Sequence, residues 1–338
     1  MSFGEITIVY DVVLIFLAIS IGILAILLFI SCKKKPIKAE ETLQPAATIC
    51  KLCACSYTLM DIDAATDGFN NRRIIGKGRL GTVYAAVMPR GKLVAVKRIH
   101  PRLVLSHAGF GFSSAIKCLS LADHPNIVPI IGYSEAPGER IIVMEYEGML
   151  SLEFYLHHNP DGAALLNWSR RLRIAAGAAR GIECLHQVMA PPIVHGCIKP
   201  SNLLIDVKFC AKLCDYGLQF LAPWERLGVV GYVDNEYWEK SGGASKESDV
   251  YGFGVVLLEL LSGRRNEGGL IVTWALPLIK VMKFDELLDP RLVIPSDIKP
   301  LIRLAKVASA CVGNSRPSRP SITQIVAILN NLEMEMCI

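Results

Sequence analysis

The stretch IVHGCIKPSNLLID, residues 193–206, places Lys199 and Asn202 at a fixed spacing after His195. A lysine and an amide side chain spaced in this way are typical of a loop that handles phosphate and a metal ion. Such chemistry needs a carboxylate that accepts a proton, and Cys197 stands where that carboxylate is expected. The stretch therefore predicts a site that keeps its binding groups and lacks its general base.

Upstream of this loop, GKGRLGTV at residues 76–83 contains three glycines, Gly76, Gly78 and Gly81. Glycine allows backbone amides to approach phosphate oxygens without a Cβ in the way. The same letters also fit a hairpin that is merely rich in glycine. The pattern needs further support from the rest of the chain.

That support comes from VAVK, which ends at Lys97, sixteen residues after the last glycine. On a strand, alternation places Ala95 and Lys97 on one face and Val94 and Val96 on the other. Lys97 can then reach under the glycine loop, although a solvated lysine on a sheet surface fits the same pattern.

Two kinds of pattern divide the rest of the chain. Residues 72–99 and 141–146 alternate β-branched residues with turn glycines, which favours antiparallel strands. Residues 166–188 carry alanine and leucine at helical spacing, and residues 248–263 are apolar almost all round. We expect a small strand-rich lobe followed by a larger helical lobe.

The composition narrows the class of protein. The chain has 338 residues, of which 52% are hydrophobic, and a net charge of +5, which excludes disorder for most of its length and gives no reason to expect a nucleic-acid partner. Most of the eleven cysteines lie singly in apolar runs, which favours a reducing compartment. Three cysteines, Cys50, Cys53 and Cys55, lie close together in the sequence. They are a weak signal for a zinc site, and acylation sites or unrelated surface cysteines fit the same spacing.

Residues 12–32 form an uncharged run of 21 residues, about 30 Å of helix, which is long enough to cross a bilayer. Acidic residues precede the run and lysines 33, 34, 35 and 38 follow it, which favours an uncleaved anchor over a cleaved signal peptide. We expect a short extracytoplasmic tail at 1–11, a single transmembrane helix at 12–32 and a cytoplasmic juxtamembrane segment at 33–69. Lys33–Lys38 would meet anionic lipid, Cys32 is a candidate for palmitoylation, and the plasma membrane is the expected location.

A series of motifs in order resembles the protein kinase family, and within it the plant receptor-like serine/threonine kinases. The series covers about residues 57–332 and consists of ATDGFNNRRIIGKGRLGTVYAAV, VAVKRI, HPNIV, SNLLID, AKLCDYG, SDVYGFGVVLLELLSGRR and SRPSITQIV. The resemblance implies an α+β, bilobal protein-kinase fold. Its N-lobe, residues 70–145, would hold a five-stranded antiparallel sheet and a helix, and its C-lobe, residues 146–333, would be helical.

The resemblance also implies ATP and Mg²⁺ as cofactors, and it implies roles for matching positions. The implied nucleotide-binding residues are Gly76, Lys77, Gly78, Arg79, Gly81, Val83, Ala95, Lys97, Met144, Asn202 and Asp215. Within this set, Asn202 and Asp215 would hold the metal and Met144 would be the gatekeeper, while Lys199 would meet the γ phosphate. His195, Tyr216, Asp249 and a Glu236–Arg319 pair would be architectural.

Three departures affect the expected phosphoacceptor side. Cys197 replaces the aspartate that receives the substrate proton, and a thiol with a pKa of about 8.5 is mostly protonated at neutral pH. Gly196 replaces the arginine before it. Val229 replaces a threonine that would form hydrogen bonds with the catalytic aspartate and lysine. Cys197 and Val229 thus remove both partners of the same hydrogen bond.

Two further departures affect the control of activity. Ala115 stands where a helix should supply a glutamate, and the chain has no acidic residue between Lys97 and Asp123. We therefore expect Lys97 to turn to Asp215. Residues 216–235 contain no serine or threonine, which excludes a switch by phosphorylation of those residue types there.

The departures favour a membrane-anchored pseudokinase that binds ATP and acts as a scaffold or allosteric partner of active receptor-like kinases or cytoplasmic signalling proteins. An active serine/threonine kinase with an atypical catalytic loop is the alternative, because the metal pair and Lys199 are intact. A third hypothesis is an adaptor that binds no nucleotide.

Overall fold

The computed structural model describes residues 53–335, apart from 107–110, 147, 223–227 and 240–241, and also Phe16, Ser20 and Gly22. The chain divides into one unit at residues 1–50 and a second at 51–338, which holds the fold. Among the described residues, none of the helices has both the length and the apolar character that crossing a membrane requires. The expected tail, transmembrane helix and Lys33–Lys38 lie outside the described residues, except for those three positions, and stay predictions.

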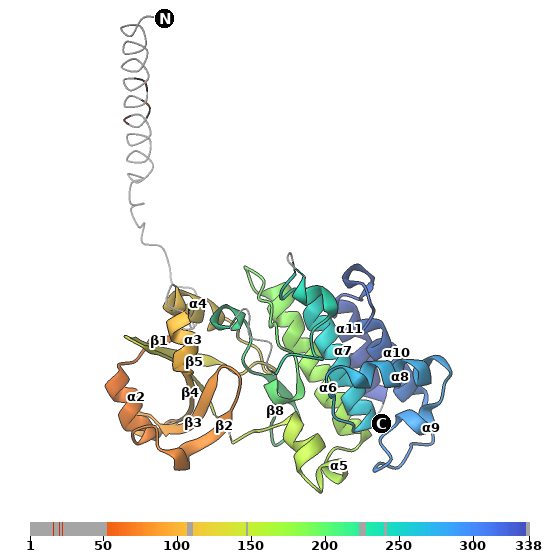
Figure 1. Cartoon of the computed structure of the whole chain (residues 1–338). Coiled ribbons are helices and arrows are strands. Elements are labelled where there is room, and N and C mark those ends of the chain that lie inside the picture. Colours follow the sequence, from red (N-terminus) through yellow and green to blue (C-terminus); the bar gives the residue numbers. More distant parts are fainter. Residues whose placement is uncertain are drawn as a thin grey trace, which may run out of the picture. The chain divides into compact units, whose positions relative to one another are not determined.

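The second unit begins with strands and continues with helices (Figure 1). The strands are β1 (Cys55–Ser56), β2 (Ile74–Lys77), β3 (Gly81–Val87), β4 (Leu93–Ile99), β5 (Ile130–Ala136), β6 (Glu139–Glu145), β7 (Leu150–Ser151), β8 (Leu203–Ile205) and β9 (Ala211–Leu213). The α-helices are α2 (Leu59–Thr66), α3 (Pro101–Ser106), α4 (Phe112–Leu119), α5 (Gly162–Leu165), α6 (Trp168–Glu183), α7 (Lys246–Ser262), α8 (Leu270–Lys280), α9 (Phe284–Leu287), α10 (Lys299–Cys311) and α11 (Ile322–Glu335).

The N-lobe sheet has six strands in the order β1-β5-β6-β4-β3-β2. Five of them are antiparallel, as expected, whereas β1 pairs with β5 in parallel through Cys55 and Ser56. The prediction of a five-stranded sheet was wrong about this edge, because two residues are too few to show an alternating pattern. The sheet therefore begins inside residues 33–69, which we expected to form a juxtamembrane segment.

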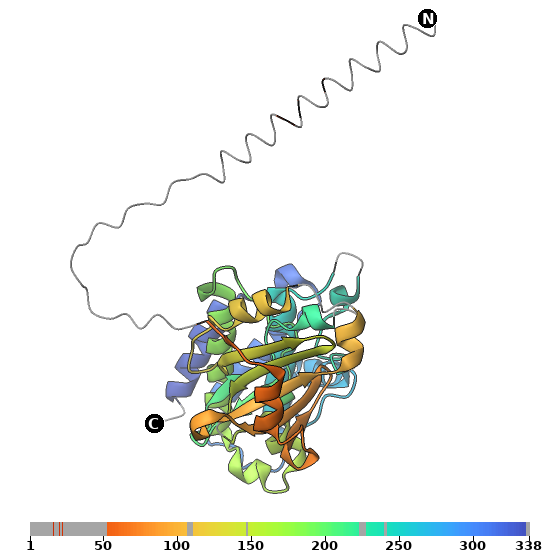
Figure 2. The same ribbon diagram turned by 90° about the vertical axis from the view of Figure 1, so that its left-hand side faces the viewer.

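The two faces of this sheet differ in what covers them. On the outer face, Val94 and Val96 of β4 are buried against Ile62 of α2, which lies across the sheet in Figure 2. On the inner face, Ala95 and Ile99 join the main core of the protein. The alternation predicted for VAVK is confirmed, and it directs Lys97 toward the second lobe.

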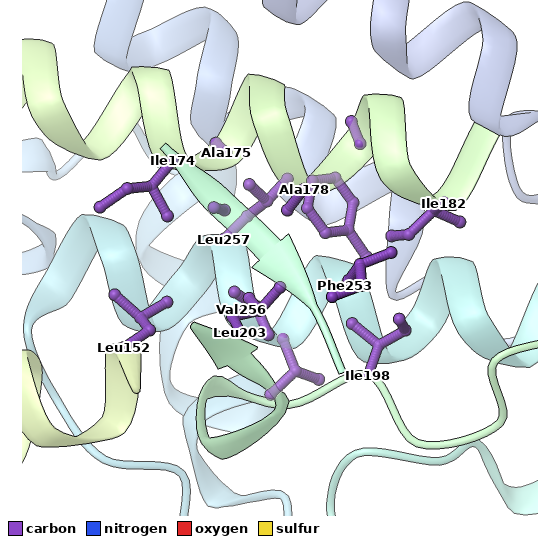
Figure 3. Packing of buried hydrophobic residues seen from close by; sticks show 14 of the residues in the cluster. Leu152, Ile174, Ala175, Ala178, Ile182, Ile198, Leu203, Phe253, Val256 and Leu257 are labelled. Carbon is purple, nitrogen blue, oxygen red and sulfur yellow. The ribbon is translucent and has the colours of Figure 1, made fainter. Parts of the chain in front are cut away.

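The helical lobe is built around α6 and α7, whose apolar side chains face each other in Figure 3. Ile198, from the loop that carries Cys197, and Leu203 of β8 lie among them. An added Cβ at Gly252 of α7 would come within 2.8 Å of the Ile198 carbonyl oxygen, so this helix needs a glycine to let the loop backbone approach. The main core thus holds the loop that carries the expected site.

A small sheet, β7-β8-β9, completes the platform for this loop. Strand β8 follows Asn202 directly, and β9 leads to Asp215. The Cys214 amide donates to the Asn202 carbonyl at 3.0 Å. The pairing of β8 with β9 therefore places the two expected metal ligands on neighbouring segments.

Candidate functional site

The glycine-rich turn connects β2 to β3, with the Gly78 amide donating to the Gly81 carbonyl at 2.9 Å. An added Cβ at Gly78 would meet no heavy atom within 4 Å, and one at Gly76 would make only ordinary contacts with Val83. The space beside these two glycines is therefore open, while the Gly78 amide itself is engaged within the turn. Lys77 lies at the end of β2 with its side chain exposed.

Gly81 has a different reason to be glycine. Its Cβ would lie 2.0 Å from the Arg98 carbonyl oxygen and 3.0 Å from the Ile99 Cα, so the close pairing of β3 with β4 excludes any side chain. Strand packing thus explains why residue 81 has no side chain, and the role at the nucleotide that the family resemblance implies for Gly81 stays a prediction.

Ala95, Met144 and Val83 lie next to one another on neighbouring strands. Ala95 pairs with Met144 on β6, and Val83 pairs with Lys97. Ala95 and Met144 are buried, and Val83 packs against the main core while partly exposed. These positions suit the apolar wall of a site that binds a flat ligand.

Lys97 is buried and forms an ion pair with Asp215, as expected from the absence of a helical glutamate. Burial raises the pKa of the Asp215 carboxyl, but the charge and hydrogen bond of Lys97 outweigh it and hold that pKa below the usual value. Ala115 lies in α4, which carries no acidic residue. The carboxylate is therefore ionised and bound to the lysine.

Asp215 is held by the residue that follows it. The Tyr216 side chain is 1% exposed, and its hydroxyl lies within hydrogen-bond distance of the Leu119 and Val128 carbonyl oxygens. Burial raises the pKa of this phenol far above its usual value, so it stays neutral. Tyr216 thus ties the segment to the end of α4 and to Val128, two residues before β5, which is the architectural role that the resemblance implied.

Asp249, at the start of α7, anchors the loop of the expected site. Its carboxylate accepts hydrogen bonds from the His195 amide at 2.7 Å, the Gly196 amide at 2.6 Å and the His186 ring at 2.8 Å. His195 is fully buried, and burial lowers the pKa of its imidazole. The loop therefore keeps a complete structural scaffold.

Cys197 lies in an apolar cluster rather than in a polar cleft. It is 5% exposed and packs with Val229 and Val233, bordered by Tyr237 and Trp238. Burial raises the pKa of its thiol more than the charges of Lys199 and Arg79 lower it, so the thiol is protonated. This residue is a poor proton acceptor for an incoming alcohol.

Lys199 and Asn202 keep positions that suit phosphate and a metal ion. The Lys199 Nζ donates to the Gly228 carbonyl at 2.9 Å, next to Val229. The Asn202 amide nitrogen donates to the Cys197 carbonyl at 2.9 Å, so the side-chain oxygen is the atom that remains for a cation. An amide oxygen and the Asp215 carboxylate are ligands that Mg²⁺ accepts, and the residues therefore fit this metal.

Two contacts near the site carry no signal in the sequence. The Arg79 guanidinium donates to the Ala222 carbonyl at 3.3 Å, and the place of Arg79 at a nucleotide stays a prediction. The Gln219 amide nitrogen donates to the His195 carbonyl. No short motif marks this contact, because it depends on the empty space at Gly196.

The expected Glu236–Arg319 pair is not formed. Arg319 instead forms an ion pair with Asp234, whose side chain is 2% exposed, whereas that of Glu236 is 36% exposed. Arg316 also pairs with Asp234, at 2.9 Å, and its amide donates to Glu236. The prediction failed because a second carboxylate, two residues earlier, lies deeper in the lobe.

Comparison with known proteins agrees with this arrangement. A family profile described as "Protein kinase domain" matches residues 69–327. Serine/threonine-protein kinase-like protein CCR2 of Arabidopsis thaliana is 36% identical over 279 residues, 81% of this chain and 34% of that protein. Proline-rich receptor-like protein kinase PERK1 of the same plant is 36% identical over 297 residues, 81% of this chain and 44% of that protein. The chain thus spans less than half the length of these curated relatives.

A solved structure is similar over both lobes. It is described as the pseudokinase domain of BIR2, an immune regulator of the RLK/Pelle family. It is 34% identical, with a TM-score of 0.71, and the match covers 82% of this chain and 86% of that one.

Proposed function

We propose, on the premise that this chain belongs to the protein kinase family and has plant receptor-like kinases among its relatives, that it is a pseudokinase. It would bind ATP and transfer phosphate too slowly to signal by catalysis. Its role would be that of a scaffold or allosteric partner for an active receptor-like kinase or a cytoplasmic signalling protein.

The apolar cluster around Cys197 carries this proposal. A general base contributes about 10²- to 10⁴-fold to a rate. Here the position of the base holds a neutral thiol that packs against Val229 and Val233. A water molecule or another carboxylate could replace the base only if the cluster opened, and its three core members are at most 7% exposed.

Nucleotide binding is supported by the opposite wall of the cleft. The space beside Gly76 and Gly78 is open, and the Lys97 ammonium group, which pairs with Asp215, can contact phosphate oxygens. Asn202 and Asp215 would hold Mg²⁺, which neutralises phosphate charge when bound. Lys97 would exchange part of its contact with Asp215 for the α and β phosphates.

A second candidate function is an active serine/threonine kinase with an atypical loop. Lys199, Asn202 and Asp215 favour it, because positioning and metal carry most of the barrier reduction in phosphoryl transfer. The pairing of Lys97 with Asp215 and the lack of an acidic residue in α4 weigh against it, since they weaken the positioning.

The membrane anchor at residues 12–32 is part of the proposal. An uncharged 21-residue run followed by lysines supports a single pass with residues 33–338 in the cytoplasm, at the plasma membrane. The receptor-like kinases among the relatives agree with a place beside a receptor. Lys33–Lys38 would add contacts with anionic lipid.

Two measurements on the purified chain test the proposal. ATP with Mg²⁺ is expected to raise the melting temperature of the wild type and not that of Lys97→Ala. Radiolabelled phosphate transfer is expected to stay at the level of the Lys97→Ala control. A melting temperature that ATP leaves unchanged would support instead an adaptor that binds no nucleotide.

A further inference from the structure

Gly196 and Gln219 occupy one shared space in the site. Gly196 has φ of +75°, and an added Cβ there would lie 1.1 Å from the Gln219 amide nitrogen. That nitrogen donates to the carbonyl oxygen of His195. Gln219 can therefore make its contact only because residue 196 has no side chain.

Gln219 begins a short 3₁₀ helix, Gln219–Leu221, which follows Asp215 by four residues. The main core anchors this helix, since Leu218, which precedes it, and Leu221, which ends it, are each 2% exposed. At its other end, the Ala222 carbonyl accepts the hydrogen bond from Arg79 of the glycine-rich turn. One short helix thus connects the glycine-rich turn to the loop of His195.

The glycine-rich turn is also held from its own lobe. The His100 amide donates to the Leu80 carbonyl at 2.9 Å, the His100 ring lies 3.1 Å from the Gly78 carbonyl oxygen, and Leu80 is 4% exposed. Arg79, between Gly78 and Leu80, extends from this turn to the second lobe. The turn is therefore fixed on both sides of the cleft.

We propose that the two contacts Gln219–His195 and Arg79–Ala222 form an autoinhibitory clasp, which holds the cleft in a closed state that nucleotide binding must open. The Arg79–Ala222 contact holds the glycine-rich turn on the second lobe, and the Gln219–His195 contact fixes the short helix that precedes Ala222. Phosphate groups need the space between that turn and Lys97. The nucleotide arm of this inference rests on the proposed function, whereas the clasp itself does not.

The clasp should reduce the affinity of the chain for a nucleotide by an amount that can be measured. A ligand that binds only the open state has its affinity reduced by the fraction of open molecules. The neutral Gln219–His195 hydrogen bond shifts that equilibrium by about two- to tenfold. Opening one contact by mutation should therefore strengthen nucleotide binding by about the same factor.

The first experiment measures the clasp without nucleotide, by amide hydrogen exchange of residues 217–222 in the purified full chain. Gln219→Ala removes the donor, and Gly196→Ala displaces the Gln219 amide, which is the far end of a flexible side chain. Gly138→Ala is the matched control, because Gly138 has φ of +73° and open space around its missing side chain. Exchange in 217–222 is expected to rise about two- to tenfold in the first two variants relative to the control.

The second experiment measures the affinity for a fluorescent ATP analogue with Mg²⁺ in the same four proteins. Gln219→Ala and Gly196→Ala are expected to bind about two- to tenfold tighter than the wild type and Gly138→Ala. Unchanged exchange in both variants, or faster exchange with unchanged affinity, would overturn the clasp as a regulator. If exchange rises and none of the proteins binds nucleotide, the proposed nucleotide binding fails while the mechanical clasp stands.

Discussion

The two sides of the candidate site differ in the chemistry of their side chains. On the nucleotide side, the charged groups have partners. Lys97 forms an ion pair with Asp215, and Lys199 donates to the Gly228 carbonyl. On the acceptor side, the position of the base belongs to a buried apolar cluster, Cys197 with Val229 and Val233. The side chains that would hold a nucleotide and the side chain at the position of the base are thus different residues, so the first group can be present without the second.

On the acceptor side, Cys197 and Val229 belong to one packed cluster and are not two separate substitutions. Cys197 and Val229 are both buried in the same apolar cluster. Each therefore provides the apolar surroundings in which the other is stable. A carboxylate placed among these side chains would lose hydration without gaining a partner. Reversal therefore requires more than one substitution.

The largest effect is expected at the scaffold under both walls. Asp249→Ala leaves the His195 and Gly196 amides and the His186 ring without their buried acceptor, at a cost of about 3–5 kcal/mol in the free energy of unfolding. Chemical denaturation measures it. Glu236→Ala removes a partly exposed carboxylate and should cost about 1 kcal/mol or less. Equal losses in the two variants would show that the loop scaffold is not intact.

The next effect tests the acceptor wall. Cys197→Asp should lower the free energy of unfolding by about 1–3 kcal/mol, because it buries a carboxyl group in the apolar cluster. Cys197→Ala serves as the control without a charge. Adding Val229→Thr to Cys197→Asp should recover part of the loss by supplying a hydrogen-bond donor. If Cys197→Asp alone is as stable as the wild type, the cluster is more open to water than its burial indicates.

The nucleotide wall offers a matched pair of glycines. Gly81→Ala should cost about 1–3 kcal/mol in stability, since the new Cβ would meet the backbone of β4. Gly78→Ala should leave stability almost unchanged and weaken ATP binding, because its surroundings are open. Denaturation curves and ATP titrations of both variants separate the two roles. A loss of stability in Gly78→Ala would contradict the open space at that turn.

The smallest effect is a pH dependence at the Lys97–Asp215 pair. Lys97 holds the pKa of Asp215 below 3.8, so the pair contributes stability above that pH and loses it as the pH falls through the lower, folded-state pKa. Asp215→Asn keeps a side chain that tolerates the observed φ of +63°. The stability difference between this variant and the wild type should be about 1 kcal/mol near pH 6 and shrink below pH 3.8. A difference that stays constant with pH would exclude the pair as its source.

Much of this cleft could be predicted from the sequence, because its signals are local. The alternation of VAVK predicted which face carries Lys97, and the missing acidic residue before Asp123 predicted the pairing with Asp215. The apolar substitutions at Cys197 and Val229 were visible as departures from a family pattern. Only the folded structure shows that these two residues pack into one cluster.

What the sequence did not predict depends on contacts between distant or very short segments. Strand β1 is two residues long and shows no periodicity. Arg319 pairs with Asp234 and not with Glu236, because the Asp234 side chain is buried and the Glu236 side chain is partly exposed. The contact of Gln219 with His195 requires an absent side chain at Gly196, and no pattern within either segment marks it.

As a pseudokinase, this chain would bind ATP without transferring its phosphate. The most direct measurement follows bound, radiolabelled ATP in a single-turnover experiment on the purified chain with Mg²⁺. We expect ATP to bind and to remain intact, with phosphate transfer no faster than in the Lys97→Ala control. Transfer at about 1–100 per second in the wild type, abolished in Lys97→Ala, would contradict the account.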